Sequence, residues 1–104
     1  TNAWIITREG ELVTRPATND ILNGITRLRI LKIAEAHGVK FVERPFSLDE
    51  ALQAREAFIS SATSFVTPVT QINDTVIGNG RAGTLSLSLR DWYDEFMAGL
   101  KESA

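Results

Sequence analysis

Two polar turns hold the residues of this sequence that are best suited to binding an anion. The first precedes a long helical pattern and reads Ile21-Leu22-Asn23-Gly24-Ile25-Thr26-Arg27. The first backbone N–H groups of a helix lack intrahelical acceptors and lie at the positive end of the helix dipole, so a phosphate can bind there. Thr26 adds a hydroxyl at the same place. The local pattern leaves two interpretations open, a phosphate site or an ordinary capped helix start.

The second turn is a run of small and hydroxyl-bearing residues, Ser60-Ser61-Ala62-Thr63-Ser64, which follows the apolar residues 57–59. Small residues allow a backbone to approach a ligand closely, and hydroxyl groups donate hydrogen bonds to phosphate oxygens. Taken locally, an ordinary turn explains the same run.

A third motif, Gly78-Asn79-Gly80-Arg81-Ala82-Gly83, has the glycine spacing of a dinucleotide-binding loop. Such a site also requires a further parallel strand with an acidic residue about 20 positions later. The residues after the motif read as a helix instead. We therefore interpret these glycines as turn residues.

Catalytic groups are scarce in this sequence. His37 is the single histidine and there is no cysteine, so neither a metal site nor a catalytic triad can be assembled. None of the lysines, Lys32, Lys40 and Lys101, stands in an apolar pocket of the kind that activates a lysine as a nucleophile. We expect no catalytic residue and no metal ligand in this chain.

The composition is that of a globular protein. Hydrophobic residues make up 43% of the 104 positions and charged residues 23%, which supports one folded core and argues against disorder. The 11 basic and 13 acidic residues are scattered, so no basic surface for nucleic acid is expected. The apolar runs are too short to cross a membrane, and the absence of cysteine fits the cytoplasm. We expect a soluble cytoplasmic protein without a nucleic-acid or membrane partner.

Strands and helices must position these turns. Residues 2–7 and 11–14 read as a hairpin in which Gly10 provides a positive φ, and residues 24–37 read as a long helix. The apolar face of this helix comprises Ile25, Leu28, Leu31, Ile33 and Ala34. The basic residues Arg27, Arg29 and Lys32 are expected on its wetter side.

Shorter elements complete one α/β unit. Ser47 and Glu50 have the spacing of a capping box that starts a helix ending near residue 54. The other expected elements are strands at residues 40–44 and 57–60, a hairpin of residues 68–72 and 75–77 around Asn73-Asp74, and a helix at residues 84–100.

Three blocks at compatible distances resemble the signature of class-IV aminotransferases: Asn2-Ala3-Trp4, Leu12-Val13-Thr14 and Leu22-Asn23-Gly24-Ile25-Thr26-Arg27. The resemblance continues through Phe58-Ile59-Ser60-Ser61-Ala62-Thr63, Pro68-Val69 and the glycine motif, and so covers nearly the whole chain. Asn23-Gly24 and Ser60-Ser61 are closer to the D-amino-acid transaminases than to the branched-chain enzymes. Two residues depart from the pattern. Trp4 stands where the family usually has tyrosine or phenylalanine, and Ala62 stands where the D-amino-acid enzymes often have threonine.

The resemblance implies a fold and a cofactor. Residues 1–104 would be the C-terminal cofactor-binding part of a fold-type IV aminotransferase, an α/β domain whose strands form a partial barrel flanked by helices. The cofactor would be pyridoxal 5'-phosphate. In such enzymes the lysine that carries the cofactor and the glutamate that pairs with its pyridine nitrogen precede the motif asparagine, here Asn2. Both would come from the remainder of the same enzyme, which would act on an amino acid and a 2-oxo acid as a homodimer.

The resemblance also assigns roles to individual residues. Gly24 would open the helix, and Ile25 and Thr26 would hold the phosphate through backbone N–H groups and the Thr26 hydroxyl. Leu22 would pack against one face of the cofactor ring. Ser61 and Ala62 would close the other side of the phosphate cup, with Ala62 offering only its backbone N–H.

The implied function is transamination between a D-amino acid such as D-alanine and a 2-oxo acid. Two alternatives share the fold: a branched-chain aminotransferase, and an aminodeoxychorismate lyase, which eliminates pyruvate instead. A further alternative is a non-catalytic binding domain that retains this part of the fold.

Overall fold

The computed structural model of this protein describes residues 2–16 and 24–103, without the side chains of residues 101–103. Its main sheet has the strand order β3-β2-β1-β4-β5, with β1 (Asn2–Ile6) in the middle. The neighbouring strands are β2 (Leu12–Thr14), β3 (Phe41–Glu43), β4 (Glu56–Ser61) and β5 (Phe65–Val69). Only the β2–β3 pair is parallel, and the others are antiparallel. The expected α/β class is confirmed, and over the described residues the sheet is open and does not close into a barrel.

The predicted first hairpin is confirmed. Strands β1 and β2 pair antiparallel with Trp4 opposite Thr14 and Ile6 opposite Leu12. Gly10 closes the turn at φ +89°, a conformation that residues with a Cβ rarely adopt. The hairpin places the end of β2 next to the end of β3, where Thr14 pairs with Glu43.

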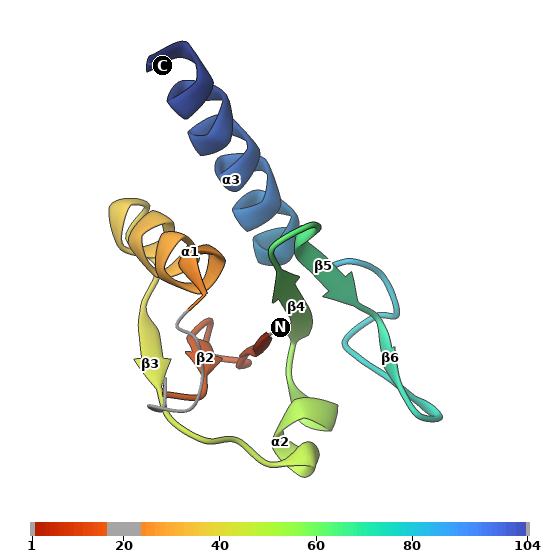
Figure 1. The fold of residues 1–104 in the computed structure, drawn as a ribbon. Coiled ribbons are helices and arrows are strands. Elements are labelled where there is room, and N and C mark those ends of the chain that lie inside the picture. Colours follow the sequence, from red (N-terminus) through yellow and green to blue (C-terminus); the bar gives the residue numbers. More distant parts are fainter. Residues whose placement is uncertain (1, 17–23, 104) are drawn as a thin grey trace.

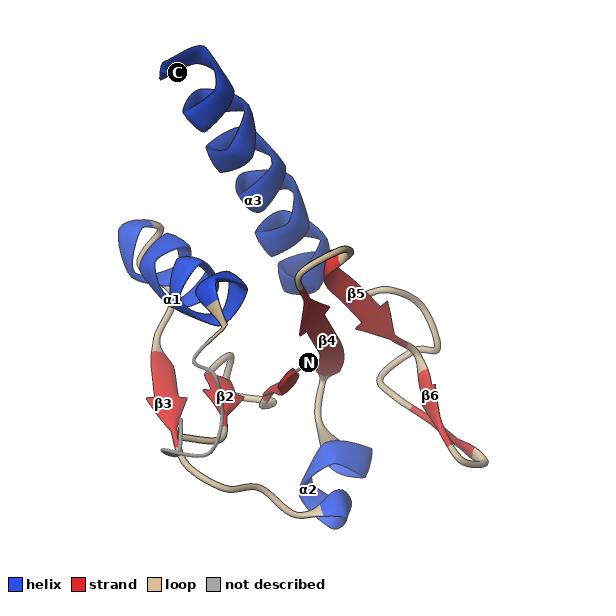
Figure 2. Cartoon of the chain, viewed as in Figure 1, coloured by secondary structure: helices blue, strands red, loops and turns tan. Residues whose placement is uncertain are grey.

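Among the described residues, three helices flank the sheet: α1 (Ile25–Ala36), α2 (Leu48–Gln53) and α3 (Thr84–Ser103). Helices α1 and α3 contact each other and β4, and α3 also covers β5. In Figure 1 these two helices lie at one end of the view and α2 at the other, with the strands between them. Figure 2, in which helices are blue and strands are red, shows the same strands between α1 and α3 on one side and α2 on the other.

The core lies on both faces of the central strand, as the two-residue period of a strand requires. Trp4 and Ile6 belong to the cluster that α1 and α3 cover, whereas Ile5 belongs to a second cluster with residues of and after α2. Trp4 is 1% exposed and Ile5 is 2% exposed, so β1 is buried on either side. A strand buried on both faces holds its neighbours β2 and β4 in a defined register.

Strand β5 was not predicted from the sequence as a separate strand. Residues 65–69 pair with β4, and Pro68 lies opposite Phe58 on this edge strand, where a missing N–H is tolerated. The predicted hairpin is confirmed in a shorter form, as β6 (Gln71–Ile72) and β7 (Thr75–Val76) with Asn73 at φ +53°. The expected strand at residues 68–72 therefore combines the end of β5 with β6, which the structure separates at Thr70.

Helix α3 packs against the sheet through Leu89 and Tyr93. Leu89 and Tyr93 are 1% and 0% exposed, and the Tyr93 ring stacks on Phe65 of β5 with centroids 4.5 Å apart. Phe96 and Leu100, farther along the same helix, are exposed. The C-terminal half of α3 extends beyond the sheet in Figure 1, which explains why its last apolar residues remain in solvent.

Candidate functional site

Helix α1 begins without a capping side chain from the described residues. Gly24 occupies the N-cap position with φ −55° and ψ 133°, and it has no side chain to accept from the first amides. The other two helices differ: Ser47 Oγ accepts from Glu50 N at 3.1 Å at the start of α2, and a carboxylate holds the start of α3. The first amides of α1 are therefore those best suited to an anion from outside the helix.

The structure brings three of the predicted site residues together at this helix start. Gly24 precedes the helix, and Ile25 and Thr26 are its first two residues. The Thr26 side chain is 6% exposed, whereas the Ile25 side chain is 59% exposed. This arrangement is compatible with the expected roles, because Ile25 would contribute only its backbone N–H. Leu22 lies outside the described residues.

Ser61 and Ala62 lie in the turn that joins β4 to β5. Ser61 is the last residue of β4 and pairs with Phe65 across the turn. Its hydroxyl oxygen accepts a hydrogen bond from Ser64 N at 3.1 Å, and Phe65 adopts φ +57°. The Ala62 side chain is exposed, so a ligand could reach the backbone of this turn.

Packing of α1 on β4 links the two groups of predicted site residues. In Figure 1 the first turn of α1 is at the end of the helix that lies toward β4, and the turn after β4 is at the tip of that strand. Trp4 holds the strand end, because its Nε1 donates to Ser60 Oγ at 2.8 Å. We predict that both groups face one phosphate.

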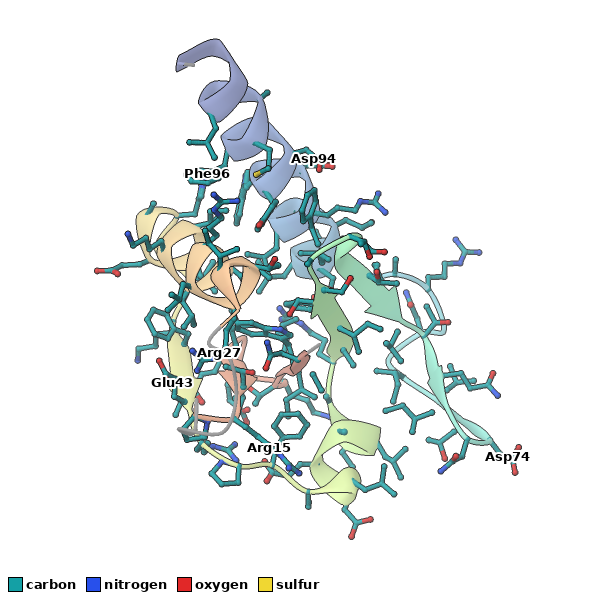
Figure 3. The ribbon with its side chains drawn as sticks, in the orientation of Figure 1. Arg15, Arg27, Glu43, Asp74, Asp94 and Phe96 are labelled. Carbon is teal, nitrogen blue, oxygen red and sulfur yellow. The ribbon has the colours of Figure 1, made fainter. Side chains whose placement is uncertain are left out.

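The predicted orientation of α1 is wrong at Arg27. We expected it on the wetter side, but it is 3% exposed, whereas Ile25 and Leu28 of the predicted apolar face are 59% and 43% exposed. Arg27 Nη2 donates to Glu43 Oε2 at 3.1 Å and to the Arg15 carbonyl at 3.2 Å. Figure 3 shows Arg27 beside Glu43. The start of α1 lies over strand ends that offer polar acceptors, and these draw the guanidinium inward.

Glu56 is a structural residue that the sequence did not reveal. It begins β4 and is 5% exposed, and its carboxylate accepts hydrogen bonds from Leu85 N at 3.2 Å and from Ser86 N at 2.8 Å. A Cβ at Gly83 would overlap this side chain, which explains the last glycine of the motif. The glycine motif therefore shapes the start of α3, whose first amides already have a carboxylate partner.

An exposed ion pair connects α2 with the segment before it. Arg44 Nη1 and Nη2 donate to Glu50 Oε1 at 3.2 Å and to Oε2 at 2.9 Å. The side-chain hydrogen bond from Arg44 lowers the pKa of Glu50 and, in return, raises the pKa of Arg44. The pair lines an open cavity of about 290 Å³ with residues of the first hairpin.

Other candidate chemical groups lie on the surface. Lys32 and Lys40 are exposed, and the Lys101 side chain lies outside the described residues. His37 stacks on Trp92 with ring centroids 3.7 Å apart, which ties the end of α1 to α3. Within the described part of the chain, histidine, cysteine, aspartate and glutamate form no group of three that could hold a metal ion. No helix there is both long and apolar enough to span a membrane.

Comparison with known proteins identifies the family. Residues 1–72 match the family model described as amino-transferase class IV. The D-alanine aminotransferase of Bacillus licheniformis is 39% identical over 85 residues, which are 82% of this chain and 30% of that protein. The D-alanine aminotransferase of Staphylococcus aureus strain N315 is 36% identical over 96 residues, which are 92% of this chain and 34% of that protein.

Solved structures share the fold. The branched-chain aminotransferase of the thermophilic archaeon Thermoproteus uzoniensis, solved with norvaline, superposes with a TM-score of 0.86 at 29% identity. The match covers 98% of this chain and 33% of that one. A Brucella abortus aminotransferase bound to PLP gives a TM-score of 0.82 at 27% identity, over 92% of this chain and 33% of that one.

These relatives agree on the family. The chain spans about a third of the length of the curated relatives it matches. The matched residues 1–72 contain the start of α1 and the turn after β4. The predicted resemblance is confirmed: this chain belongs to the class IV aminotransferase family.

Proposed function

We propose that this chain is the phosphate-binding part of a pyridoxal-phosphate-dependent aminotransferase that exchanges an amino group between a D-amino acid, such as D-alanine, and a 2-oxo acid. The observation that carries the proposal is the first turn of α1, which no described side chain caps and which lies inside the matched family region. A phosphate group there would meet the first helix amides and the positive end of the helix dipole.

The residues at this helix start fit the phosphate of the cofactor. Ile25 and Thr26 would donate backbone N–H groups, and the Thr26 hydroxyl would add a third donor. The first turn contains no acidic residue that would repel the phosphate. Ser61 and Ala62 would close the opposite side of the cup from the turn after β4, and Leu22 would pack against the cofactor ring.

The chain's own residues would bind and orient, and the reacting groups would come from elsewhere. Pyridoxal phosphate, when bound, supplies the electron sink that stabilises a substrate carbanion. The proton that moves at the substrate α-carbon needs a positioned base. Lys32 and Lys40 are exposed, so we assign this role to a lysine in the remainder of the enzyme, together with the glutamate that pairs with the pyridine nitrogen.

The amino donor is proposed from the curated relatives. Those at 35–39% identity are D-alanine aminotransferases, whereas several of the similar structures, at 29–31% identity, are branched-chain enzymes. Assays of the complete enzyme with D-alanine, L-leucine and aminodeoxychorismate separate these possibilities. Transfer from D-alanine supports the proposal, and exclusive transfer from L-leucine replaces it with the branched-chain alternative.

We extend the proposal to the assembly and the compartment. The family resemblance supports a homodimer, and a cytoplasmic location is compatible with a sequence that contains no cysteine. Sedimentation of the complete enzyme tests the dimer directly.

A matched pair of variants tests the phosphate site in the complete enzyme. Thr26→Ala removes a charge-assisted hydrogen bond worth about 1.5–3 kcal/mol, so the affinity for pyridoxal phosphate should fall by roughly tenfold or more. Thr26→Ser keeps the hydroxyl and should retain most of the affinity. Equal cofactor affinity in Thr26→Ala would remove Thr26 from the site, and a wild-type enzyme without cofactor would favour a non-catalytic binding domain.

A further inference from the structure

Arg27 joins three elements at the start of α1. Its Nη2 donates to the Arg15 carbonyl, which directly follows β2, and to Glu43, the last residue of β3. Strands β2 and β3 are parallel, and Thr14 pairs with Glu43, so their carboxyl ends meet at this point. Arg44 N donates to the Thr14 carbonyl at 2.9 Å and closes the same junction. One guanidinium thus fixes the first turn of α1 against two strand ends.

The position of this cation conflicts with the preference of an isolated helix. A positive side chain in the first turn opposes the positive end of the helix dipole, and acidic residues are favoured there instead. Helix α1 has no acidic residue in its first turn, and it buries Arg27 to 3% exposure. A charge that opposes the helix dipole in this way is a local conflict, and such conflicts are typical of functional sites. Glu43 of β3 supplies part of the opposing negative charge, and an anion bound at the helix start would add to it.

Burial makes Arg27 a rigid element of the junction. The carboxylate of Glu43 is 41% exposed, so solvent screens the pair on one side, whereas the guanidinium is enclosed. The planar fork of arginine directs its donors in a fixed geometry, which lysine does not reproduce. Arg27 follows Thr26 directly, so a shift of its guanidinium would also move the amides of Ile25 and Thr26.

We propose that Arg27, held by Glu43 and the Arg15 carbonyl, is a positioning residue that aims the first amides of α1 and the Thr26 hydroxyl at the cofactor phosphate. The inference rests on the proposed function and adds the element that orients its site. Arg27 acts through the helix start that it fixes. Glu43, although negatively charged, then favours phosphate binding, because it holds Arg27 in place.

The sign of the Glu43→Gln effect separates positioning from simple charge attraction. If Arg27 acted only through its positive field, removing the Glu43 carboxylate would strengthen phosphate binding. If Arg27 acts by positioning, the same change weakens binding, because the guanidinium loses an anchor. Arg27→Lys provides the second test, since it keeps the charge and loses the two-acceptor geometry.

The experiment uses the complete enzyme in its cofactor-free form. Equilibrium titrations, followed by absorbance, measure the affinity for pyridoxal phosphate and for pyridoxal, which lacks the phosphate. We expect pyridoxal phosphate affinity to fall about tenfold or more in Arg27→Gln and about three- to tenfold in Arg27→Lys and Glu43→Gln. Pyridoxal affinity should change less than about twofold in all three variants, because no phosphate is involved.

Glu50→Gln is the matched control, because it removes a carboxylate of the same type from the exposed Arg44 pair. It should leave both affinities unchanged. Higher or equal pyridoxal phosphate affinity in Glu43→Gln overturns the inference, as does an equal loss of pyridoxal affinity. If Arg27→Gln fails to fold, Arg27→Lys and Glu43→Gln decide the question. A wild-type enzyme that binds no pyridoxal phosphate refutes the proposed function itself, whereas binding unaffected by these variants refutes only the role of Arg27.

Discussion

Replacing Glu56 should open the first turn of α3. In the structure, Glu56 Oε1 accepts from Ser86 N at 2.8 Å and from Ser86 Oγ at 2.9 Å, and Oε2 accepts from Leu85 N at 3.2 Å. These donors lie at the positive end of the helix dipole and are enclosed with a carboxylate that is 5% exposed. The side chain therefore caps a helix from a strand 29 or 30 residues earlier in the sequence.

The magnitude follows from these contacts. Hydrogen bonds to a charged group contribute about 1.5–3 kcal/mol each, but neighbouring bonds do not add, and water can enter the space that a smaller residue leaves. We expect Glu56→Ala to lower the free energy of local opening at the start of α3 by about 2–4 kcal/mol. Glu56→Gln keeps one acceptor oxygen and should lose about 1–2 kcal/mol.

Hydrogen exchange in the complete enzyme measures this effect. A loss of about 2–4 kcal/mol corresponds to an increase of about 30- to 1000-fold in the exchange of the Leu85 and Ser86 amides. Ser86→Ala removes one donor and leaves the carboxylate, so it should raise exchange by a smaller factor. Amides in the middle of α1 provide the internal reference and should not change. An increase below about threefold at both amides in Glu56→Ala would refute the assignment of Glu56 as the cap.

Three further predictions address the site, the chemistry and the pH dependence. In the complete enzyme, Ala62→Thr should be tolerated, with cofactor affinity equal to or higher than that of the wild type. Ala62→Pro removes the backbone donor and should weaken cofactor retention. Equal cofactor retention in a normally folded proline variant would show that this turn does not bind phosphate. The 104-residue chain on its own should transfer no amino group, because it lacks a positioned base worth about 10²–10⁴ in rate. Borohydride reduction with pyridoxal phosphate and peptide mapping tests this, and stoichiometric labelling of Lys32, Lys40 or Lys101 with activity would contradict it. Because Arg44 lowers the pKa of Glu50 in the folded state, the pair stabilises the fold above the ordinary glutamate pKa and loses this contribution as the pH falls through the lowered pKa. Denaturation midpoints should therefore be higher for the wild type than for Glu50→Gln at neutral pH, by a small margin that disappears in acid; a difference that does not vary with pH would rule this out.

Local patterns in the sequence determined most of the secondary structure and the family. The strand patterns at residues 2–7 and 11–14 and the position of Gly10 predicted the first hairpin, and the spacing of Ser47 and Glu50 predicted the cap of α2. The expected helices agree with α1 and α3 within a few residues. These features depend on neighbours within a few positions, so a one-dimensional pattern is sufficient to detect them.

The long-range pairings depended on the tertiary structure. Nothing near Glu56 in the sequence indicates that its carboxylate caps α3, because the donors come from residues 85 and 86. The full extent of strand β5 was not predicted, because its pairing with β4 and the place of Pro68 on the sheet edge follow only from the strand order. Edge positions and distant caps are properties of the assembled sheet.

The start of α1 shows most clearly which features the sequence determined and which the tertiary structure decided. The motif Leu22–Arg27 and its resemblance predicted a phosphate site from the sequence alone, since unpaired helix amides are a local property. The same sequence placed Arg27 in solvent, because a helical pattern alone assigns a charged residue to the wet side. Arg27 is buried because the ends of β2 and β3 meet beneath it and present the Arg15 carbonyl and the Glu43 carboxylate. Only the fold brings those two acceptors, 12 and 16 positions away, to one guanidinium.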